Sequence, residues 1–287
     1  MSLVPIKDML EKARAEKYAV PAFDVCNLEF IRAVVEVAEE KLSPVILMVL
    51  PHEFDTNLPY LVSMARTAAE QISVPIALHL DHSPSFELCK AAIDAGFSSV
   101  MIDGSTLPYE ENVKLTRKVV EYAKPKGVSV EAELGHVGKA EANAGEGEDE
   151  GYFTDPEDVP RFIEETGVDA LAVAIGTAHG IYTREPKLDI QRLAAINRVS
   201  SVPLVLHGGS GTPDDQVKEA IANGISKLNI FSELCVALVD GLKDFMANNQ
   251  QRAPLPSHVF EKSITLMKDV VRCKIDLCGS AGKGHRA

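Results

Sequence analysis

The sequence predicts an α/β protein folded as a (β/α)8 barrel, with extra helices at the N-terminal and C-terminal ends. Eight short, mostly apolar segments of strand length alternate with helical patterns along the chain. No dinucleotide-binding glycine fingerprint is present, which favours a closed barrel over an open doubly wound sheet. Polar residues stand at the C-terminal ends of most of these segments, where barrels of this class place their functional groups.

The expected strands are short and largely buried. Residues 44–50 form an uninterrupted apolar run, as parallel strands covered on both faces do. The third strand alternates instead, with Ile76, Leu78 and Leu80 on one face. The expected strands are 18–24, 44–50, 74–81, 99–103, 128–133, 169–175, 203–207 and 226–230.

Amphipathic helical patterns lie between and around these strands. In the first of them, Ile6, Leu10 and Ala13 fall on one stripe. A proline in the first turn, Pro156, opens the helix that follows the fifth strand. The expected helices are 2–17, 28–41, 60–71, 85–95, 109–124, 155–166, 214–223, 233–248 and 259–273.

Composition and charge exclude several classes of protein. The chain has 287 residues, 46% of them hydrophobic, and we expect a single domain over residues 1–287 because no linker divides it. The net charge of −13 argues against nucleic acid as a partner. No run approaches the roughly 18–20 apolar residues of a membrane span, and no signal peptide is recognisable. Five scattered cysteines are typical of free thiols, so we expect a cytoplasmic protein.

Three titratable residues lie within four positions at the end of the third strand. His79 and Asp81 are two apart, so they share a face of the strand, and His82 is expected to begin the following loop. Buried Asp and His cost free energy unless they are paired or bind a metal. The segment is therefore either a functional site or a satisfied polar cluster that closes the strand.

Histidines that follow three different strands suggest a metal site. His82, His179 and His207 come after strands three, six and seven, and only a closed barrel would bring them together. Three protein ligands with one open position are typical of catalytic zinc. Asp103 and Glu133, at neighbouring strand ends, would orient these ligands or offer a second metal position. The alternative is that each histidine is an ordinary hydrogen-bonded side chain.

Glycine-rich turns follow the seventh and eighth strands. Phosphate sites in these barrels are often built there, because glycine admits an anion close to the backbone and a helix N-terminus points free N–H groups at it. A turn without a ligand is the alternative. The candidate residues are Gly208, Gly209, Ser210, Asn229, Ile230, Phe231 and Ser232.

Six motifs together resemble class II, zinc-dependent ketose-bisphosphate aldolases, and the similarity extends over essentially the whole chain. Within that family the sequence is most similar to the tagatose- and fructose-bisphosphate aldolases. The motifs are His79–His82, Met101–Ser105, Val130–Gly135, Ala174–Gly180, Val205–Gly211 and Leu228–Ile230.

The resemblance implies a role for each candidate residue. His82, His179 and His207 would bind zinc, Asp103 and Glu133 would match a second metal site, and Asp81 would be the acid/base on the aldehyde-derived oxygen. A monovalent cation, Na+ or K+, is implied near the phosphate. The residues expected to hold dihydroxyacetone phosphate are Gly180, Gly208, Gly209, Ser210, Asn229, Ile230, Phe231 and Ser232.

A mobile active-site loop is expected at about residues 135–153. In the family a glutamate of this loop protonates the carbanion carbon, and Glu141 matches it. The alternative is a solvated charge, because the loop has further glutamates. The family loop usually contains Gly-Gly-x-Glu-Asp, from which residues 138–142 depart.

Other departures from the family lie in the first strand, in the phosphate segment and near the end of the chain. Asp24 stands where Asn is common, and Phe231 stands where the family has a small or polar residue. Residues 255–257 replace an Asp-Pro-Arg whose arginine is expected to bind the phosphate of the aldehyde, so the acceptor is expected to be unphosphorylated or differently charged. Arg252 or Lys262 would substitute if the backbone differs.

The predicted function is reversible, zinc-dependent aldol cleavage of a ketose 1,6-bisphosphate or ketose 1-phosphate to dihydroxyacetone phosphate and an aldehyde. A zinc-dependent hydrolase on the same barrel, or a sugar-phosphate-binding relative without turnover, are the alternatives. The resemblance also implies a homodimer or homotetramer with a small phosphorylated sugar as substrate, and the lack of a long apolar run predicts no membrane partner.

Overall fold

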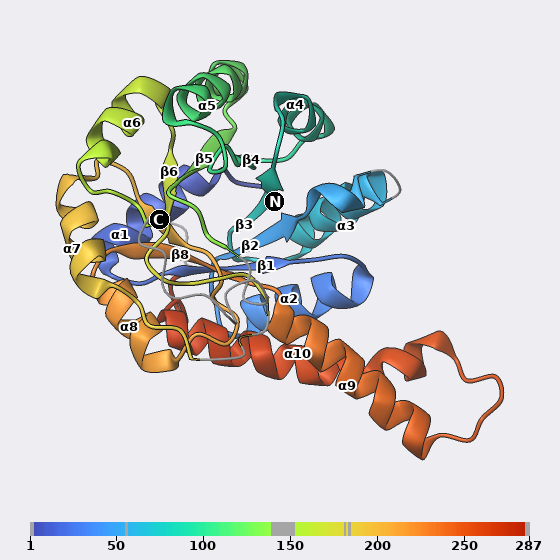
Figure 1. Ribbon diagram of the computed structural model, residues 1–287. Coiled ribbons are helices and arrows are strands. Elements are labelled where there is room, and N and C mark those ends of the chain that lie inside the picture. Colours follow the sequence, from blue (N-terminus) through green and yellow to red (C-terminus); the bar gives the residue numbers. More distant parts are fainter. Residues whose placement is uncertain (1–2, 55–56, 139–152, 181, 183–184, 285–287) are drawn as a thin grey trace.

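Eight parallel strands close into a barrel in the order of the sequence, with β1 paired to β8 (Figure 1). The computed structural model describes residues 3–54, 57–138, 153–180, 182 and 185–284. This architecture confirms the predicted (β/α)8 barrel and both sets of additional helices. The strands are β1 Val20–Asp24, β2 Val45–Val49, β3 Ile76–Ser83, β4 Ser99–Ile102, β5 Ser129–Leu134, β6 Ala170–Val173, β7 Leu204–Leu206 and β8 Ile225–Ile230.

Helices surround the barrel and extend beyond it. Most of the expected boundaries agree with the structure to within three residues, but the first helix begins at Ile6 instead of residue 2, and the last helix runs from Pro256 to Cys278 and is longer than expected. The helices are α1 Ile6–Glu16, α2 Leu28–Glu40, α3 Leu58–Gln71, α4 Phe86–Ala95, α5 Tyr109–Ala123, α6 Asp158–Thr166, α7 Ile190–Val199, α8 Asp214–Ala222, α9 Ser232–Asn248 and α10 Pro256–Cys278, with short 3-10 turns η1 Pro51–Glu53 and η2 Lys124–Lys126.

Helix α7 was not predicted from the sequence. Its signals are present, because the Asp189 carboxylate accepts a hydrogen bond from the backbone N–H of Arg192 and caps the first turn. Leu193 and Ile196 are buried on one face. The helix is short and only those two of its residues are buried, so its apolar stripe is weak in the sequence.

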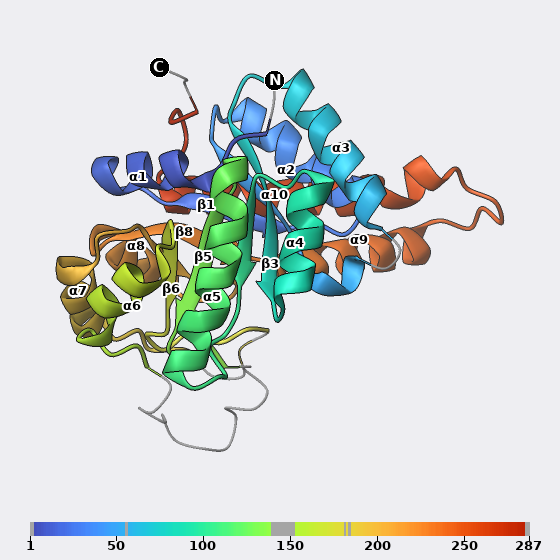
Figure 2. The ribbon, with the colours of Figure 1, turned by 90° about the horizontal axis from the view of Figure 1, so that it is seen from above.

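The barrel interior is filled from the end where the strands begin. There, Ile6, Leu10 and Ala13 of α1 pack with Ile46 and Ala172 from inside the barrel. Helix α1 lies across this end (Figure 2), and the backbone N–H of Lys7 donates to the Ser129 hydroxyl at the start of β5. Helix α1 therefore closes this end of the barrel and leaves the opposite, C-terminal end of the strands open.

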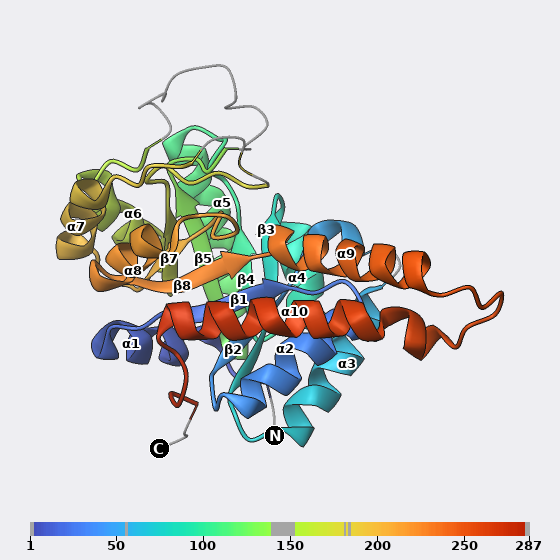
Figure 3. The same cartoon turned by 90° about the horizontal axis from the view of Figure 1, so that it is seen from below.

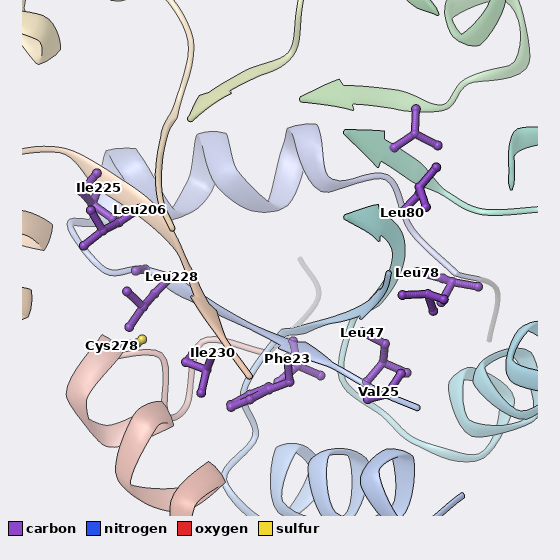
Figure 4. Close-up of a cluster of buried hydrophobic side chains, with 14 of the residues drawn as sticks. Phe23, Val25, Leu47, Leu78, Leu80, Leu206, Ile225, Leu228, Ile230 and Cys278 are labelled. Atoms are coloured by element: carbon purple, nitrogen blue, oxygen red, sulfur yellow. The ribbon is translucent and has the colours of Figure 1, made fainter. Parts of the chain in front are cut away.

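A second apolar layer lies between the strands and the surrounding helices. Phe23, Leu47, Leu78 and Leu228 point outward from their strands into this layer (Figure 4). Burying each such side chain contributes about 1.5–3 kcal/mol, so the layer holds the helices against the barrel. With this rigid support, the strand ends can keep polar groups in fixed positions.

Strand β3 continues through His82 to Ser83, which corrects the expectation that His82 begins a loop. The pairing of β3 with β4 shifts between Leu80 and Ser83, and His82 has a φ of 47°. A bulge of this kind re-aims a side chain, while a left-handed conformation outside glycine costs about 1–3 kcal/mol. The backbone therefore turns the His82 imidazole at the rim of the barrel.

Helices α9 and α10 form an antiparallel hairpin that projects away from the barrel (Figure 3). Helix α9 begins beside the barrel rim and spans about 25 Å from end to end, given 1.5 Å per residue. Among the described residues, no helix combines the length and the apolar character needed to cross a bilayer.

Candidate metal centre and active-site cavity

A cavity of about 340 Å³ opens at the C-terminal ends of the strands. Each of the eight strands, or the segment directly after it, contributes a residue to its wall, which is the arrangement that a barrel imposes on a shared site. The lining residues are Asp24, Leu50, Asp81, His82, Asp103, His136, Val137, His179, Gly180, Gly208, Ser210, Asn229, Ile230, Phe231 and Ser232.

The three histidines expected to bind metal meet at this cavity: His82 and His179 line it, and His207 is buried against His82. The Nε2 atom of His82 lies 3.1 Å from Nε2 of His179 and 2.8 Å from Nδ1 of His207. Nitrogens on a tetrahedral zinc with bonds of about 2.0–2.1 Å lie about 3.3 Å apart. The donor atoms and their spacing therefore fit a zinc ion with one position left for substrate.

The charges around these rings favour a cation. Burial acts to lower the pKa of His82, but the Asp81 and Asp103 carboxylates outweigh it and raise that pKa to about 10. Burial lowers the pKa of His179 to about 4, and the neighbouring His82 adds to this effect. Burial likewise lowers the pKa of His207, so His179 and His207 are neutral, and the carboxylates that favour a proton on His82 would equally favour a metal ion in its place.

A second group of potential ligands shares His82. Asp103 Oδ2 lies 2.9 Å from Nδ1 of His82, and Glu133 stands within reach of the same group. Burial, and then the charge of Asp103, raise the pKa of Glu133 to about 8. One oxygen of this carboxylate accepts the backbone N–H of Val137, while the other, Oε2, is buried without a hydrogen-bond partner in the structure. Such an oxygen fits a bound cation or a proton.

Asp81 lies in the wall of the cavity beside the histidines. Its side chain is buried, and Oδ1 accepts a hydrogen bond of 3.2 Å from the Asn229 amide. Its Oδ2 lies 3.9 Å from Nε2 of His82. The carboxylate therefore has one oxygen held by Asn229 and a second near the candidate metal position.

The glycine-rich segment after β7 approaches other backbone closely. Gly208 has a φ of 67°, and a Cβ atom there would lie 2.5 Å from the Ala178 carbonyl oxygen. Ser210 Oγ accepts the backbone N–H of Phe231 at the start of α9. The Glu233 N–H donates to the same oxygen at 3.5 Å, so Ser210 holds the N-terminus of α9, with its partial positive charge, beside the cavity.

Four of the sequence-predicted site residues are not among the described residues that line the cavity, namely Glu133, Glu141, His207 and Gly209. Gly209 is outside the cavity wall, because its N–H donates to the Asn229 carbonyl and joins the segment after β7 to β8. Glu141 lies outside the described residues. His207 and Glu133 are fully buried against the wall residues His82 and Val137, and the remaining candidates line the cavity.

The structure adds residues to the cavity that sequence reasoning missed. His136 was assigned to an ordinary loop, but it lines the cavity, and its Nδ1 lies 2.8 Å from the Ser105 hydroxyl, which itself donates to Asp103. Asp24 also lines the wall, where burial and then Asp81 raise its pKa well above the usual value. The sequence signal that could have identified both residues is their position along the chain, because Asp24 ends β1 and His136 follows β5.

Comparison with known proteins agrees with the motifs. A family model described as fructose-bisphosphate aldolase class-II matches residues 4–283. The chain belongs to this family. Membership confirms the resemblance noted in the sequence and supports a lyase.

Solved structures of this family have the same fold as the chain. The YdjI aldolase from Escherichia coli K12 is 36% identical, with a TM-score of 0.87 over 99% of this chain and 100% of that one. A putative fructose-1,6-biphosphate aldolase from Coccidioides immitis is 34% identical, with a TM-score of 0.84 over 96% of each chain. Fructose-bisphosphate aldolase from Campylobacter jejuni, at 22% identity and a TM-score of 0.82 over 98% of this chain and 97% of that one, is similar in fold.

Proposed function

We propose that this protein is a zinc-dependent class II aldolase. It reversibly cleaves a ketose 1-phosphate, or a ketose 1,6-bisphosphate of the tagatose or fructose type, to dihydroxyacetone phosphate and an aldehyde. The observation that carries the proposal is the meeting of three imidazoles, one on β3 and two in the segments after β6 and β7, beside one carboxylate at a cavity of about 340 Å³. Family membership supports the same reaction class.

Zinc would be held by His82, His179 and His207, whose nitrogens all lie within 4.8 Å of one another. When bound, it supplies Lewis-acid stabilisation of the negative charge that C–C cleavage leaves beside the ketone. Asp103 orients His82 by accepting the hydrogen bond from Nδ1, which leaves Nε2 facing the cavity. Glu133, with its unpartnered oxygen, would serve a second metal position together with Asp103.

Asp81 is the proposed acid/base. Its carboxylate would accept the C4 hydroxyl proton in cleavage and return it to the aldehyde in condensation. The Asn229 amide holds one of its oxygens, so the other is presented in a fixed direction. Glu141, which the sequence motif matches, is the proposed proton donor to the carbanion carbon.

The phosphate of the substrate would bind at the segments after β7 and β8. Gly180, Gly208 and Ser210 line that side of the cavity, together with residues 229–232. The partial positive charge at the N-terminus of α9, which lies beside the same side of the cavity, would favour the anion. Gly209 would act by keeping the two segments together, and a monovalent cation, Na+ or K+, would balance the phosphate charge.

The alternatives explain less of this geometry. A zinc hydrolase would use Asp81 to activate water and has no need of glycine-rich segments beside the metal position. A binding protein without turnover would not require a buried carboxylate held beside three imidazoles. An aldolase accounts for both features.

A coupled assay for dihydroxyacetone phosphate tests the proposal. Purified protein is expected to consume dihydroxyacetone phosphate with at least one aldehyde from a panel, to lose this activity with EDTA, and to regain it with zinc. Activity that persists in a protein shown to be metal-free would contradict the zinc mechanism. The absence of product with every aldehyde, despite bound zinc, would contradict the aldolase.

We further propose that an unphosphorylated acceptor aldehyde, and therefore a ketose 1-phosphate, is preferred over the phosphorylated aldehyde of a ketose 1,6-bisphosphate. Among its described residues the cavity wall has no lysine or arginine, and it presents Asp24, Leu50 and Phe231 in addition to the metal-side carboxylates. Residues 255–257 lie at the far end of the hairpin, about 25 Å along α9 from the barrel rim. In paired kinetics, kcat/KM for glyceraldehyde is expected to exceed that for glyceraldehyde 3-phosphate; the reverse order would overturn this proposal.

The hairpin also suggests a homo-oligomer. Val236, Val239 and Met246 of α9 and Leu255 before α10 are exposed apolar side chains on a projecting element, and exposed apolar patches often mark protein contacts. Sedimentation is expected to give two or four times the chain mass of 31.0 kDa. A monomer at micromolar concentration would contradict the proposed homo-oligomer.

A cytoplasmic location is proposed as well, because all five cysteines are free thiols.

A further inference from the structure

A buried charged group lies directly beneath the cavity, inside the barrel. Glu131 of β5 and Lys227 of β8 are both fully buried, and Nζ of Lys227 lies 2.8 Å from Oε2 of Glu131. Neither residue has a role in the proposed reaction as described so far. Burying two charges carries a desolvation penalty that apolar side chains of similar volume would avoid, so the pair calls for an explanation beyond stability.

The second oxygen of Glu131 contacts a proposed zinc ligand. Its Oε1 lies 2.9 Å from Nε2 of His207. A carboxylate can only accept, so Nε2 must carry the proton and donate it. The other ring nitrogen, Nδ1, then has a free lone pair. That nitrogen is the one that faces His82 at 2.8 Å in the cavity.

Lys227 determines which oxygen of the Glu131 carboxylate is left to accept from His207. Its ammonium group, which only donates, occupies Oε2 and leaves Oε1 for His207. His79, whose Nδ1 lies 2.9 Å from the Ser99 hydroxyl, packs with its Nε2 3.8 Å from the same carboxylate. The carboxylate is thus enclosed, cannot rotate into solvent, and has one direction in which to accept from the histidine.

We propose that Glu131, held by Lys227, is a positioning residue that fixes His207 in the tautomer and orientation needed to bind zinc through Nδ1. This rests on the proposed zinc aldolase and adds to it a role for two buried residues. Partners of this kind typically change metal affinity by about 10–100-fold when they are removed.

Two variants test the inference, with zinc affinity as the main measurement. Glu131→Gln keeps the shape but offers an amide that can donate as well as accept, so the tautomer is no longer imposed. The double variant Glu131→Met/Lys227→Met removes both charges together, which avoids an unpaired buried ion and preserves packing. Chelator competition is expected to show zinc binding about 10–100-fold weaker in both.

A matched control uses a Lys–Asp pair outside the barrel. Lys41 and Asp276 lie 2.9 Å apart on the surface, and Lys41→Met/Asp276→Met is expected to bind zinc as the unmodified protein does. The absorption spectrum of the cobalt-substituted protein gives a second readout, and it should change only in the Glu131 variants. If Glu131→Gln does not fold, the zinc affinity of the double variant tests the inference.

The outcomes separate this inference from the function on which it rests. Weakened zinc binding and an altered cobalt spectrum in a folded double variant support it. A folded double variant with unchanged zinc affinity overturns it, even if the aldolase assay succeeds. If the unmodified protein binds no zinc, the proposed function itself fails, and the inference fails with it.

Discussion

Asp81→Asn is expected to lower kcat for aldol cleavage by about 10²–10⁴-fold, the usual contribution of a general acid or base. An amide has nearly the same shape as the carboxylate but cannot take up the hydroxyl proton. The Asn229 amide would still find an oxygen at this position, so the fold of the cavity should be kept. The rate is measured as dihydroxyacetone phosphate release, with the zinc content determined in the same preparation.

Zinc content decides how this result is interpreted. Asp81 does not bind the metal in the proposed site, so the variant should retain stoichiometric zinc. A surface control, Asp94→Asn, removes a carboxylate paired with Lys126 and should leave kcat unchanged. Full activity in Asp81→Asn would show that another group transfers the proton.

His179→Ala is expected to weaken zinc binding by more than the roughly 100-fold that a supporting partner contributes, and to abolish activity at micromolar zinc. One of three imidazole donors is lost, and the neighbouring ring of His82 loses the contact at 3.1 Å. His179 follows β6 and is only partly buried, so its removal should not unfold the barrel. Chelator competition measures the affinity, and thermal unfolding checks the fold.

A histidine remote from the cavity provides the comparison. His258 is exposed in the first turn of α10, and His258→Ala should bind zinc and turn over substrate normally. Unchanged zinc affinity in His179→Ala would show that His179 is not a zinc ligand. The proposed three-histidine centre would then be wrong.

Most of the fold could be predicted because its pattern is local. Buried parallel strands such as Val45–Val49 are continuous apolar runs, and α1 displays an apolar stripe that requires no knowledge of its partner. Helix α7 was missed because it is short and its stripe is weak. The end of β3 was misplaced because a bulge depends on pairing with β4, which the sequence of β3 does not reveal.

Less of the site than of the fold could be predicted from the sequence. His82, His179 and His207 could be selected because each follows a strand, and the family motifs supported the choice. His136 was set aside as a loop residue, since its contact with Ser105 depends on how the segments after β4 and β5 meet. The orientation of His207 could not be predicted either, because it depends on a carboxylate and a lysine from two other strands.

The sequence by itself determined the alternation of strands and helices, the family, and the identities of the candidate ligands. These follow from local periodicity and from motifs that are contiguous in the chain. Only the tertiary structure decided which nitrogen of each imidazole faces the cavity, and that Glu131 and Lys227 support one of them from below. The reason is physical: hydrogen-bond direction depends on atoms far apart in sequence, and closure of the barrel alone brings them within 3 Å.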